Sequence, residues 1–360
     1  MTRFIDRFFP LPHYLSFDSV GFDISDQSIR FVELVRSNTT ISLKKFGEEK
    51  IPPGIVSAGK VVNKSQFKEV LVALRKKHKF STVHVSLPEE QVYLFELEIP
   101  KVESSNIRQN IELSLEEHIP ITASDALFDY DLIKETPENY TVQVQAVPES
   151  IVSAYLAPLA EAGLTVVSLE LEAQAIARAI VAPNDPRTYM VLDFGSTRTG
   201  VSFITNGTVS FTTTFDIGGA TQTEIIAKHF NISMQQAEVL KRERGLLRSG
   251  DDKDLFAVLL NNLSILRDEI NKHYIFWHTH PDEQGNSKPR VEKVLLCGQS
   301  SNLAGFAEYL SASLKNQVVQ TDAWVNIRSD KDYVPDIPKD QSLGYVTAIG
   351  LALSSFIQKQ

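Results

Sequence analysis

Two aspartates stand at matching places in two similar stretches of the sequence. Asp23 ends the apolar stretch VGFD and Asp193 ends MVLD, and each is followed by a short polar loop and a second apolar stretch. Mg²⁺ prefers carboxylate oxygens together with water and phosphate oxygens. Small residues in a loop after a strand let backbone N–H groups approach an anion. The pair therefore predicts two loops that clamp one Mg²⁺–phosphate group between them.

The two loops belong to an internal repeat. The first copy reads VGFDIS, DQSIRFVELVR, a turn near Ser37-Asn38, and ISLKKFGEEKI. The second copy, over residues 189–219, reads YMVLDFGS, TRTGVSFIT, a turn at Asn206-Gly207, and TVSFTTTFDIG. Asn-Gly is a strong signal for a two-residue β-hairpin. The copies are about 170 residues apart, whereas a solenoid repeats every 20 to 50 residues or so, and we therefore expect two related lobes.

Two glycine-containing stretches could complete a nucleotide site. A strand that ends at Gly298, followed by Gln299, Ser300 and then a helix, can seat a flat ring against the backbone. The pair Gly218-Gly219 ends the second copy and would allow a further close approach of backbone to ligand.

Charged pairs and histidines give weaker signals. Glu238 and Lys241 are three residues apart and share a helix face, so they could grip a ribose or a phosphate. Taken alone, such a pair is typical of a solvated ion pair. His273, His278 and His280 lack Cys or carboxylate partners at metal-ligand spacing, and we expect them at the C-terminal end of a helix.

One apparent phosphate-binding motif fails on inspection. The stretch from Gly54 to Lys60 matches G-x-x-x-x-G-K, but Val61 stands where a P-loop needs Ser or Thr to hold Mg²⁺. No buried strand precedes it. We interpret it as a loop before the amphipathic helix KSQFKEVLVALRKKHKF, whose apolar face carries Phe67, Val70, Leu71 and Leu74.

Composition excludes several classes of protein. The chain has 360 residues, 42% hydrophobic residues, a net charge of -9 and one cysteine. The negative charge argues against nucleic-acid binding and against wide adhesion to an anionic membrane. A single cysteine allows no internal disulfide and suits a reducing cytoplasm. No run approaches the roughly 20 apolar residues of a membrane span, and we expect residues 1–17 to form an N-terminal arm rather than a signal peptide.

The remaining pattern alternates strands with helices. Strands are expected at VHVSLP, VYLFELEIP, FDYDLI, YTVQVQAVP and VEKVLLCGQ. One helix is expected to start at Ser104 or Ser105, and another is expected to end at Gly163. Further helices are expected over LEAQAIARAIV, in three segments between residues 221 and 277, over LAGFAEYLSASL, and over GYVTAIGLALSSFI. The pattern predicts an α/β fold.

In this order, the elements resemble the actin-like ATPase superfamily and, within it, the PilM type IV pilus assembly proteins, relatives of FtsA. The resemblance runs from about Val20 to the end. It rests on GFDISDQSIRFVEL, LDFGSTRTGVSFITNG, IGGATQTEIIAKHFNISMQQAEVLK, RDEINKHYIF and LLCGQSSNLAGFAEYL. EHIPI before DYDLI, and LAEAGLTVVSLELEAQAIARAI, are similar to the inserted subdomain and the connecting helix of that family.

The resemblance implies two duplicated lobes with mixed sheets flanked by helices, closing on ATP. An N-terminal segment would cover residues 1–17. Lobe I would cover 18–185, with an inserted interaction subdomain at about 88–163 and a C-terminal helix, 340–360, that returns to it. Lobe II would cover 186–339, with a helical subdomain at about 220–290.

The resemblance also implies a nucleotide site, residue by residue. The first loop would meet phosphates and Mg²⁺ through Asp23, Ser25, Asp26, Gln27 and Ser28. The second loop would do so through Asp193, Gly195, Ser196 and Thr197, with Gly218 and Gly219 near the phosphates. The ribose side would meet Glu238 and Lys241, and the adenosine would meet Gly298, Gln299 and Ser300. Mg²⁺ would bind Asp23 and Asp193, mostly through water. Glu172 would be the catalytic group, where hydrolysing relatives place a water-polarising side chain.

Three positions depart from the superfamily pattern. Ser25 replaces a glycine, Arg30 replaces a lysine, and Gln299 replaces the second glycine of the adenosine loop. Each glycine replacement reduces backbone freedom. We therefore expect ATP·Mg²⁺ binding with slow or absent hydrolysis, and at most a weak ATPase.

The implied function is that of a cytoplasmic scaffold at the inner face of the membrane, in the assembly platform of type IV pili or a related type II secretion system. Its partner would be the N-terminal tail of a PilN-like single-span inner-membrane protein, alongside other platform components; self-association is left open, and membrane association would be indirect.

Two alternatives remain. An FtsA-like filament protein would need a basic amphipathic membrane helix, which SSFIQKQ does not supply. A small-molecule kinase of the superfamily would need an Asp or Glu base beside an acceptor pocket, and no loop between the two copies is obviously free for it.

Overall fold

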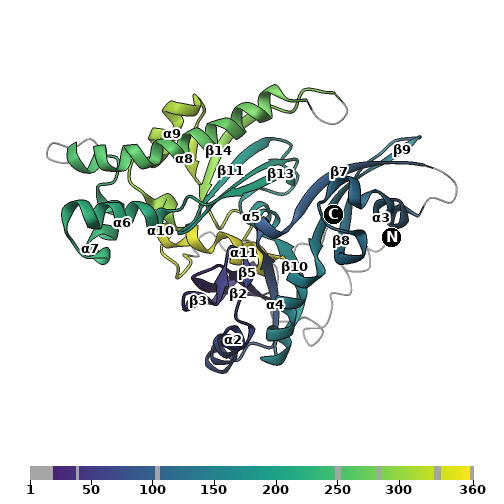
Figure 1. Cartoon of the computed structure of the whole chain (residues 1–360), viewed down its shortest axis with the longest axis horizontal. Helices are drawn as coiled ribbons and strands as arrows, with labels where there is room; N and C mark the ends of the chain where they lie inside the picture. The colour runs from purple at the N-terminus through teal and green to yellow at the C-terminus, as the bar shows by residue number, and fades with distance from the viewer. Residues whose placement is uncertain are drawn as a thin grey trace.

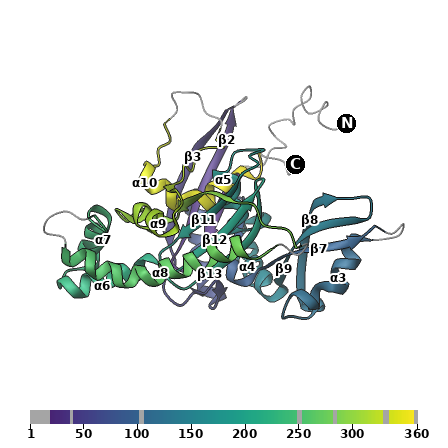
Figure 2. The ribbon, with the colours of Figure 1, turned by 90° about the horizontal axis from the view of Figure 1, so that it is seen from above.

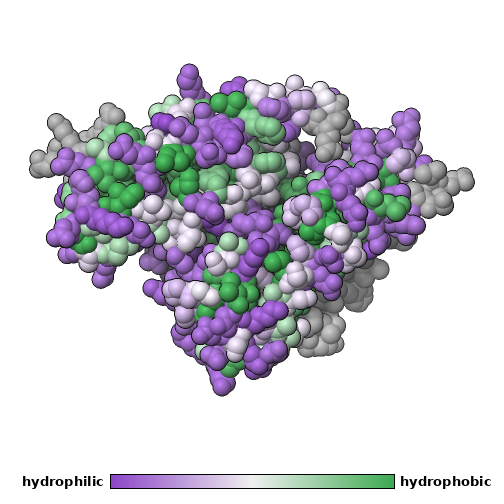
Figure 3. Space-filling view, viewed as in Figure 1, coloured by the Kyte–Doolittle hydropathy of each residue, from purple (hydrophilic) through white to green (hydrophobic). Residues whose placement is uncertain are grey.

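The computed structural model describes residues 19–37, 40–101, 106–247, 253–281, 285–327 and 334–356. The expected N-terminal arm, most of the turn near Ser37-Asn38, the expected helix starts at Ser104 and Ser105, and residues 357–360 lie outside these ranges. No helix in the described ranges has the length and apolar character needed to cross a membrane. Hydrophilic side chains cover most of the face shown in Figure 3, and the hydrophobic patches on it are small and separate.

Lobe I is built on a five-stranded sheet with the order β10-β6-β1-β2-β3. Strands β1, β2 and β3 form an antiparallel meander, and β6 and then β10 extend the sheet beside β1, parallel to it. The strands are β1 (Ser19–Ile24), β2 (Ser28–Ser37), β3 (Thr40–Lys50), β6 (Thr82–Leu87) and β10 (Thr165–Leu171).

Lobe II repeats this sheet strand for strand, in the order β13-β12-β11-β14-β15. Strands β11, β12 and β13 again form an antiparallel meander, and β14 and then β15 extend the sheet beside β11, parallel to it. Asn206 and Gly207 have φ values of 53° and 77°, as the predicted hairpin turn requires. The predicted duplication is confirmed. The strands are β11 (Thr188–Phe194), β12 (Thr199–Thr205), β13 (Thr208–Phe215), β14 (Val291–Cys297) and β15 (Val318–Gln320).

Two apolar helices lie between the sheets, at the centre of Figure 1. They are α5 (Glu172–Ile180) and α11 (Val346–Leu353), and they pack against each other in one core with Val32 of lobe I and Val191 of lobe II. The C-terminal helix is shorter than the expected range 340–360: α10 (Lys339–Ser342) and η5 (Leu343–Tyr345) occupy the start of that range, and α11 ends at Leu353.

Other helices cover the outer surfaces. Lobe I carries α2 (Lys64–His78), which buries Phe67, Leu71 and Leu74 as predicted, and α4 (Glu149–Glu161). Lobe II carries α6 (Gly219–Phe230), α7 (Met234–Glu243), α8 (Lys253–Thr279) and α9 (Phe306–Leu314). The short η4 (Gln299–Asn302) follows β14 and buries Ser300 and Ser301. Figure 1 places α6 and α7 at one end of the molecule.

An inserted subdomain stands at the opposite end (Figure 2). It is a three-stranded sheet, β7-β9-β8, with α3 (Ile107–His118) packed on one face through Ile111 and Leu115. Its strands are β7 (Tyr93–Pro100), β8 (Ala126–Glu135) and β9 (Asn139–Pro148), and two short helices flank them, η2 (Glu89–Gln91) and η3 (Ala123–Asp125). The N-cap of α3 is Asn106, whose side chain accepts a hydrogen bond from Arg108 N.

The stretch that mimics a P-loop is a small hairpin. Its strands are β4 (Val56–Ser57) and β5 (Lys60–Val61), and they pair antiparallel around Ala58 and Gly59. This confirms that it precedes α2 as a loop and does not open a helix on a buried strand.

Candidate functional site

The two aspartates occupy equivalent positions in the duplicated sheets. Asp23 is the penultimate residue of β1 and pairs with Arg30 of β2, and Asp193 is the penultimate residue of β11 and pairs with Gly200 of β12. Burial raises the pKa of both carboxyls, and that of Asp193 reaches about 6, with the charge of Asp23 adding to the effect. The tertiary structure therefore brings the two predicted carboxylates into one electrostatic environment.

Loop 1, residues 25–28, is held by hydrogen bonds of its own backbone and side chains. Ser28 N donates to Ser25 Oγ at 3.2 Å, and Ser25 N donates to Ser28 O at 2.9 Å. The carboxylate of Asp26 accepts hydrogen bonds from Ala58 N and Gly59 N at 2.9 and 3.1 Å. Asp26 thus fixes loop 1 to the β4–β5 turn, a structural task that the sequence did not suggest.

Loop 2, residues 195–198, is packed against the start of α6. Gly219 N donates to Gly195 O at 3.0 Å, and Ala220 N donates to Ser196 O at 2.8 Å. A Cβ on Gly218 would lie 2.3 Å from Ser196 O. Only glycine permits this approach, so the Gly218-Gly219 pair has a packing reason that is visible in the fold.

Backbone N–H groups remain available on both loops. The amides of Asp26 and Gln27 in loop 1, and of Ser196 and Thr197 in loop 2, donate no hydrogen bond to any other part of the chain that the structure describes. Polar N–H groups that cluster without a protein acceptor are suited to an anion. This donor set fits the phosphate groups expected there.

The loop after β14 also lies close to Asp193. Gly298 has φ 86°, and a Cβ there would lie 2.4 Å from Asp193 Oδ1. The side chain of Gln299 accepts a hydrogen bond from Arg30 of lobe I. A Cβ on Gly219 would lie 2.1 Å from Ser300 Oγ. The residues predicted for the adenosine side therefore adjoin those predicted for the phosphates.

Lys241 is satisfied within the protein. Its Nζ donates to Gly219 O at 3.0 Å and to Thr223 Oγ1 at 2.7 Å, and it lies 2.7 Å from Glu238 Oε2. Burial lowers the pKa of this ammonium. Lys241 thus ties α7 to the start of α6, and the half-exposed Glu238 is the member of the pair that remains accessible to a ligand.

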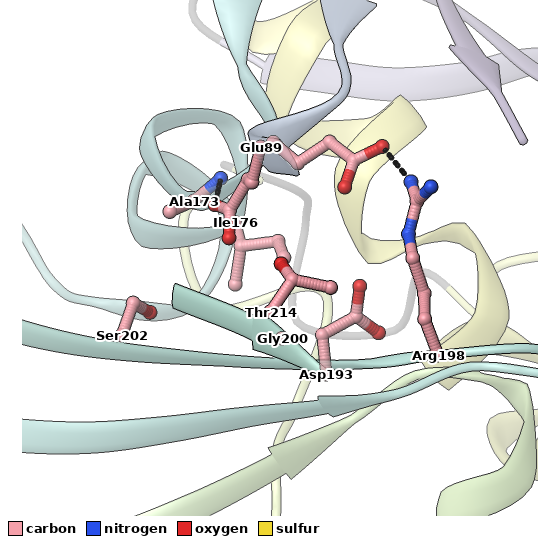
Figure 4. A pocket seen from close by; sticks show the side chains of 9 residues that line it. Glu89, Ala173, Ile176, Asp193, Arg198, Gly200, Ser202 and Thr214 are labelled. Carbon is pink, nitrogen blue, oxygen red and sulfur yellow. Dashed lines mark hydrogen bonds and ion pairs between the residues drawn. The ribbon is translucent and has the colours of Figure 1, made fainter. Parts of the chain in front are cut away.

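Sequence reasoning missed an ion-pair cluster at the centre of the site. Arg198 of loop 2 places Nη1 2.6 Å from Glu90 Oε1 and Nη2 2.7 Å from Glu172 Oε1. Burial raises the pKa of Glu172 well above its ordinary value, and Arg198 opposes this. Figure 4 shows Asp193 and Arg198 in the same pocket, with Ala173 and Ile176 of α5 also lining it.

Glu89 was also missed. Its Oε1 accepts from Ala173 N at 2.8 Å and so caps the start of α5, and its Oε2 accepts from Thr212 Oγ1 of lobe II at 2.6 Å. Burial raises the pKa of Glu89 to about 7. The available signal was the Glu89-Glu90 pair after the strand VHVSLP, because β6 runs parallel to β1 and ends at the same sheet edge as loop 1.

The pocket is small and mainly polar. It is lined by Glu89, Glu172, Ala173, Ile176, Asp193, Arg198, Gly200, Ser202 and Thr214. Within the described ranges, no three His, Cys, Asp or Glu side chains are grouped as direct ligands of a metal ion. That includes His273, His278 and His280 at the end of α8, where His273 stacks on Phe215.

A family model described as type IV pilus assembly protein PilM matches residues 21–356. The chain belongs to the PilM family. It is therefore an actin-like protein of type IV pilus assembly.

Solved structures agree with this on the fold. A chain of a PilM-PilN type IV pilus biogenesis complex has 23% identity and a TM-score of 0.74, over 95% of this chain and 99% of that chain. The ethanolamine utilization protein EutJ of Carboxydothermus hydrogenoformans has 18% identity and a TM-score of 0.51, over 96% and 91%. MreB5 of Spiroplasma citri bound to ADP has 13% identity and a TM-score of 0.52, over 85% and 92%. The predicted actin-like ATPase fold is confirmed.

Proposed function

We propose that this PilM family member binds ATP with Mg²⁺ between its lobes and binds the N-terminal tail of a PilN-like membrane protein. It would act as a scaffold of the assembly platform at the cytoplasmic face of the membrane. The observation that carries the nucleotide part is the matched pair of loops: each follows a partly buried Asp with a raised pKa, and each offers two backbone N–H groups without a protein acceptor among the described residues. MreB5, which shares the fold, is bound to ADP in its structure, and this supports the proposal.

The charges in the cleft explain why Mg²⁺ should accompany the nucleotide. Five carboxyl groups surround two arginines there, and a free polyphosphate would add more negative charge. The groups are Asp23, Glu89, Glu90, Glu172 and Asp193, with Arg30 and Arg198. Bound Mg²⁺ supplies positive charge to phosphate oxygens, and Asp23 and Asp193 would hold it through water. The amides of Asp26, Gln27, Ser196 and Thr197 would hold the phosphates, near Gly195, Ser25, Ser28, Gly218 and Gly219.

The nucleoside would lie between α7 and the loop after β14. Gly298, Gln299 and Ser300 would face the base, and the accessible carboxylate of Glu238 would accept hydrogen bonds from ribose hydroxyls. Lys241 would support this wall through Gly219 and Thr223, because its ammonium is already satisfied there.

Hydrolysis would be slow or absent. A carboxylate that orients an attacking water must be free to accept a hydrogen bond from that water. Glu172 instead holds Arg198 at 2.7 Å in a buried pair. We infer that the nucleotide sets a conformation and that its turnover is not the main purpose of the site.

The inserted subdomain would bind the partner's tail. Its strand β8 lies at the edge of the sheet and exposes Leu127, Leu132 and Ile133, with exposed fractions of 44%, 50% and 43%. An extended peptide can add to such an edge, with backbone hydrogen bonds for affinity and apolar contacts for specificity. The similar fold of the PilM chain in a PilM-PilN complex supports a PilN-type partner.

Calorimetric titration tests both parts. ATP·Mg²⁺ is titrated first, and then the N-terminal peptide of a PilN-like single-span membrane protein. We expect saturable binding in each titration, and the absence of both would refute the proposal. Phosphate transfer to a small hydroxylic acceptor would instead favour the kinase, and partner-free sedimentation of the ATP-loaded protein with lipid vesicles would favour the FtsA-like filament.

A further inference from the structure

The short helix η2 is connected to both loop 1 and loop 2. Glu90 accepts from Arg198 of loop 2. Gln91 Nε2 donates to Ala58 O at 3.1 Å, and the same turn is bound by Asp26 of loop 1. Thus one three-residue helix is attached to loop 2 directly and to loop 1 through the β4–β5 turn.

The same helix leads directly into the inserted subdomain. Only Val92 separates η2 from β7, and β7 pairs with β9 from Tyr93 to Pro100. Because β7 is bonded to β9 along its whole length, a displacement of η2 is transmitted to the three-stranded sheet and not absorbed by a loose connection. The nucleotide loops and the proposed partner site are therefore linked through a short segment of chain.

The Arg198–Glu90 pair is well suited to exchange. Glu90 Oε2 is buried and has no hydrogen-bond partner among the described residues, so its carboxylate is incompletely satisfied. The exchange leaves Glu90 without its cation, which is costly, so the bonds from Arg198 to the phosphate must outweigh that cost. A phosphate group carries more charge than a carboxylate and also binds arginine through two hydrogen bonds.

Arg198 also stands beside the expected phosphates. It follows Thr197 directly, and the amides of Ser196 and Thr197 are the available donors of loop 2. We propose that Arg198 exchanges Glu90 for a phosphate group of the bound nucleotide, and that this exchange loosens η2 and strand β7, while Glu89 and Gln91 keep η2 attached to α5, β13 and the β4–β5 turn. The inference rests on the proposed nucleotide binding and adds its regulatory consequence. Because coupling between two sites is reciprocal, a partner that shifts β7 would change nucleotide affinity by the same factor.

Two amides report the state of η2. Gln91 N donates to Pro88 O at 3.0 Å, and Val92 N donates to Glu89 O at 3.2 Å. Hydrogen exchange of the full chain is measured over residues 88–100, without nucleotide and with ATP·Mg²⁺ or ADP·Mg²⁺. We expect ATP·Mg²⁺ to speed exchange of these two amides in the wild type, because the bond from Arg198 to Glu90 is lost. ADP should do so less if the terminal phosphate is the group that Arg198 binds.

Glu90→Gln removes the competing charge and keeps the shape of the side chain. We expect its ATP affinity to rise about fivefold, and its η2 amides to exchange rapidly with or without nucleotide. The matched control is Glu161→Gln, which breaks the exposed ion pair between Glu161 of α4 and Lys68 of α2 and should behave as the wild type does. Circular dichroism checks that both variants are folded.

The outcomes separate the two proposals. If the wild type binds ATP but exchange over η2 does not change, Arg198 does not act as a switch, while nucleotide binding stands. An unchanged ATP affinity in Glu90→Gln leads to the same conclusion. If the wild type binds no nucleotide, both proposals fail. The exchange measurement on the wild type needs no variant, so the inference can be refuted even if Glu90→Gln misfolds.

Discussion

Arg198 and Glu90 belong to different lobes, yet Nη1 of Arg198 lies 2.6 Å from Oε1 of Glu90. The guanidinium also holds Glu172 at the start of the connecting helix α5. One side chain of lobe II thus joins the start of the inserted subdomain to the centre of the molecule. The cleft between the lobes is crossed by the protein's own charges where nucleotide is expected.

This arrangement predicts a large, pH-dependent loss of stability on Arg198→Gln. The variant leaves the carboxylates of Glu90 and Glu172 buried without their cation, which typically costs about 3–5 kcal/mol. The pKa of Glu172 is already raised by burial, and loss of Arg198 would raise it further. We therefore expect the deficit to be largest at pH 8 and to shrink as Glu172 is protonated at lower pH. Urea unfolding at several pH values measures it.

The control for that prediction is Arg242→Gln. Arg242 pairs with Asp340, and both side chains are about half exposed. Exposed pairs contribute roughly 0–1 kcal/mol, so this variant should unfold near the wild-type urea concentration. Equal losses in the two variants would contradict a special role for the buried cluster.

Removing either aspartate should abolish nucleotide binding. We expect Asp23→Ala and Asp193→Ala to lose detectable ATP·Mg²⁺ binding in calorimetry and to keep a folded circular dichroism spectrum. Both carboxyls are partly buried with raised pKa values, so their ionised forms do not stabilise the fold. Asp268→Ala, an exposed change on α8, serves as the control. Wild-type affinity in both cleft variants would show that the site lies elsewhere.

Glu89→Gln should stabilise the protein at neutral and alkaline pH. The pKa of Glu89 is about 7 in the fold against an ordinary 4.5. A raised folded pKa means that this group's contribution is present below pH 4.5 and is lost as pH rises toward 7. Glutamine does not titrate and can still bond Ala173 N and Thr212. The variant should gain up to about 3 kcal/mol over wild type at pH 8 and almost nothing at pH 4.5. A pH-independent difference would contradict this.

Gly298→Ala should lower stability by more than the strain of the backbone at residue 298 explains, and it should weaken ATP binding. Gly298 and Gly54 have φ values of 86° and 85°, but a Cβ on Gly54 meets nothing within 4 Å. Gly54→Ala should therefore show mainly the strain, about 1–2 kcal/mol. At Gly298 the methyl group would also displace the Asp193 carboxylate. We expect a larger loss of stability and weaker ATP binding there, measured by thermal unfolding and calorimetry.

The partner site predicts a selective loss of peptide affinity. Leu132→Asp on β8 places a charge on the edge that we propose for strand addition, and it should weaken binding of the partner peptide at least tenfold. Ile265→Asp changes a similarly exposed apolar residue on α8 and should leave peptide binding unchanged. Equal peptide affinities for the two variants would place the tail elsewhere on the molecule.

Local pattern was sufficient for much of the fold. Alternating apolar residues, the Asn206-Gly207 turn and the apolar face of α2 each depend on neighbours a few residues away in the chain. The duplication could therefore be predicted, because Asp23 and Asp193 stand at equivalent places in two similar stretches. The pairing of β6 with β1 connects distant segments, so the position of Glu89 and Glu90 beside loop 1 could not be seen in the same way.

The sequence by itself determined the two-lobed plan, the matched aspartates and the glycines that adjoin them, because these follow from short-range periodicity and turn chemistry. Only the tertiary structure decided which charges meet. It gave Arg198 two carboxylates of the other lobe, gave Asp26 the amides of the β4–β5 turn, and satisfied Lys241 within α6 and α7. An ion pair depends on distance in space and on burial, and neither is written in the spacing of residues along the chain.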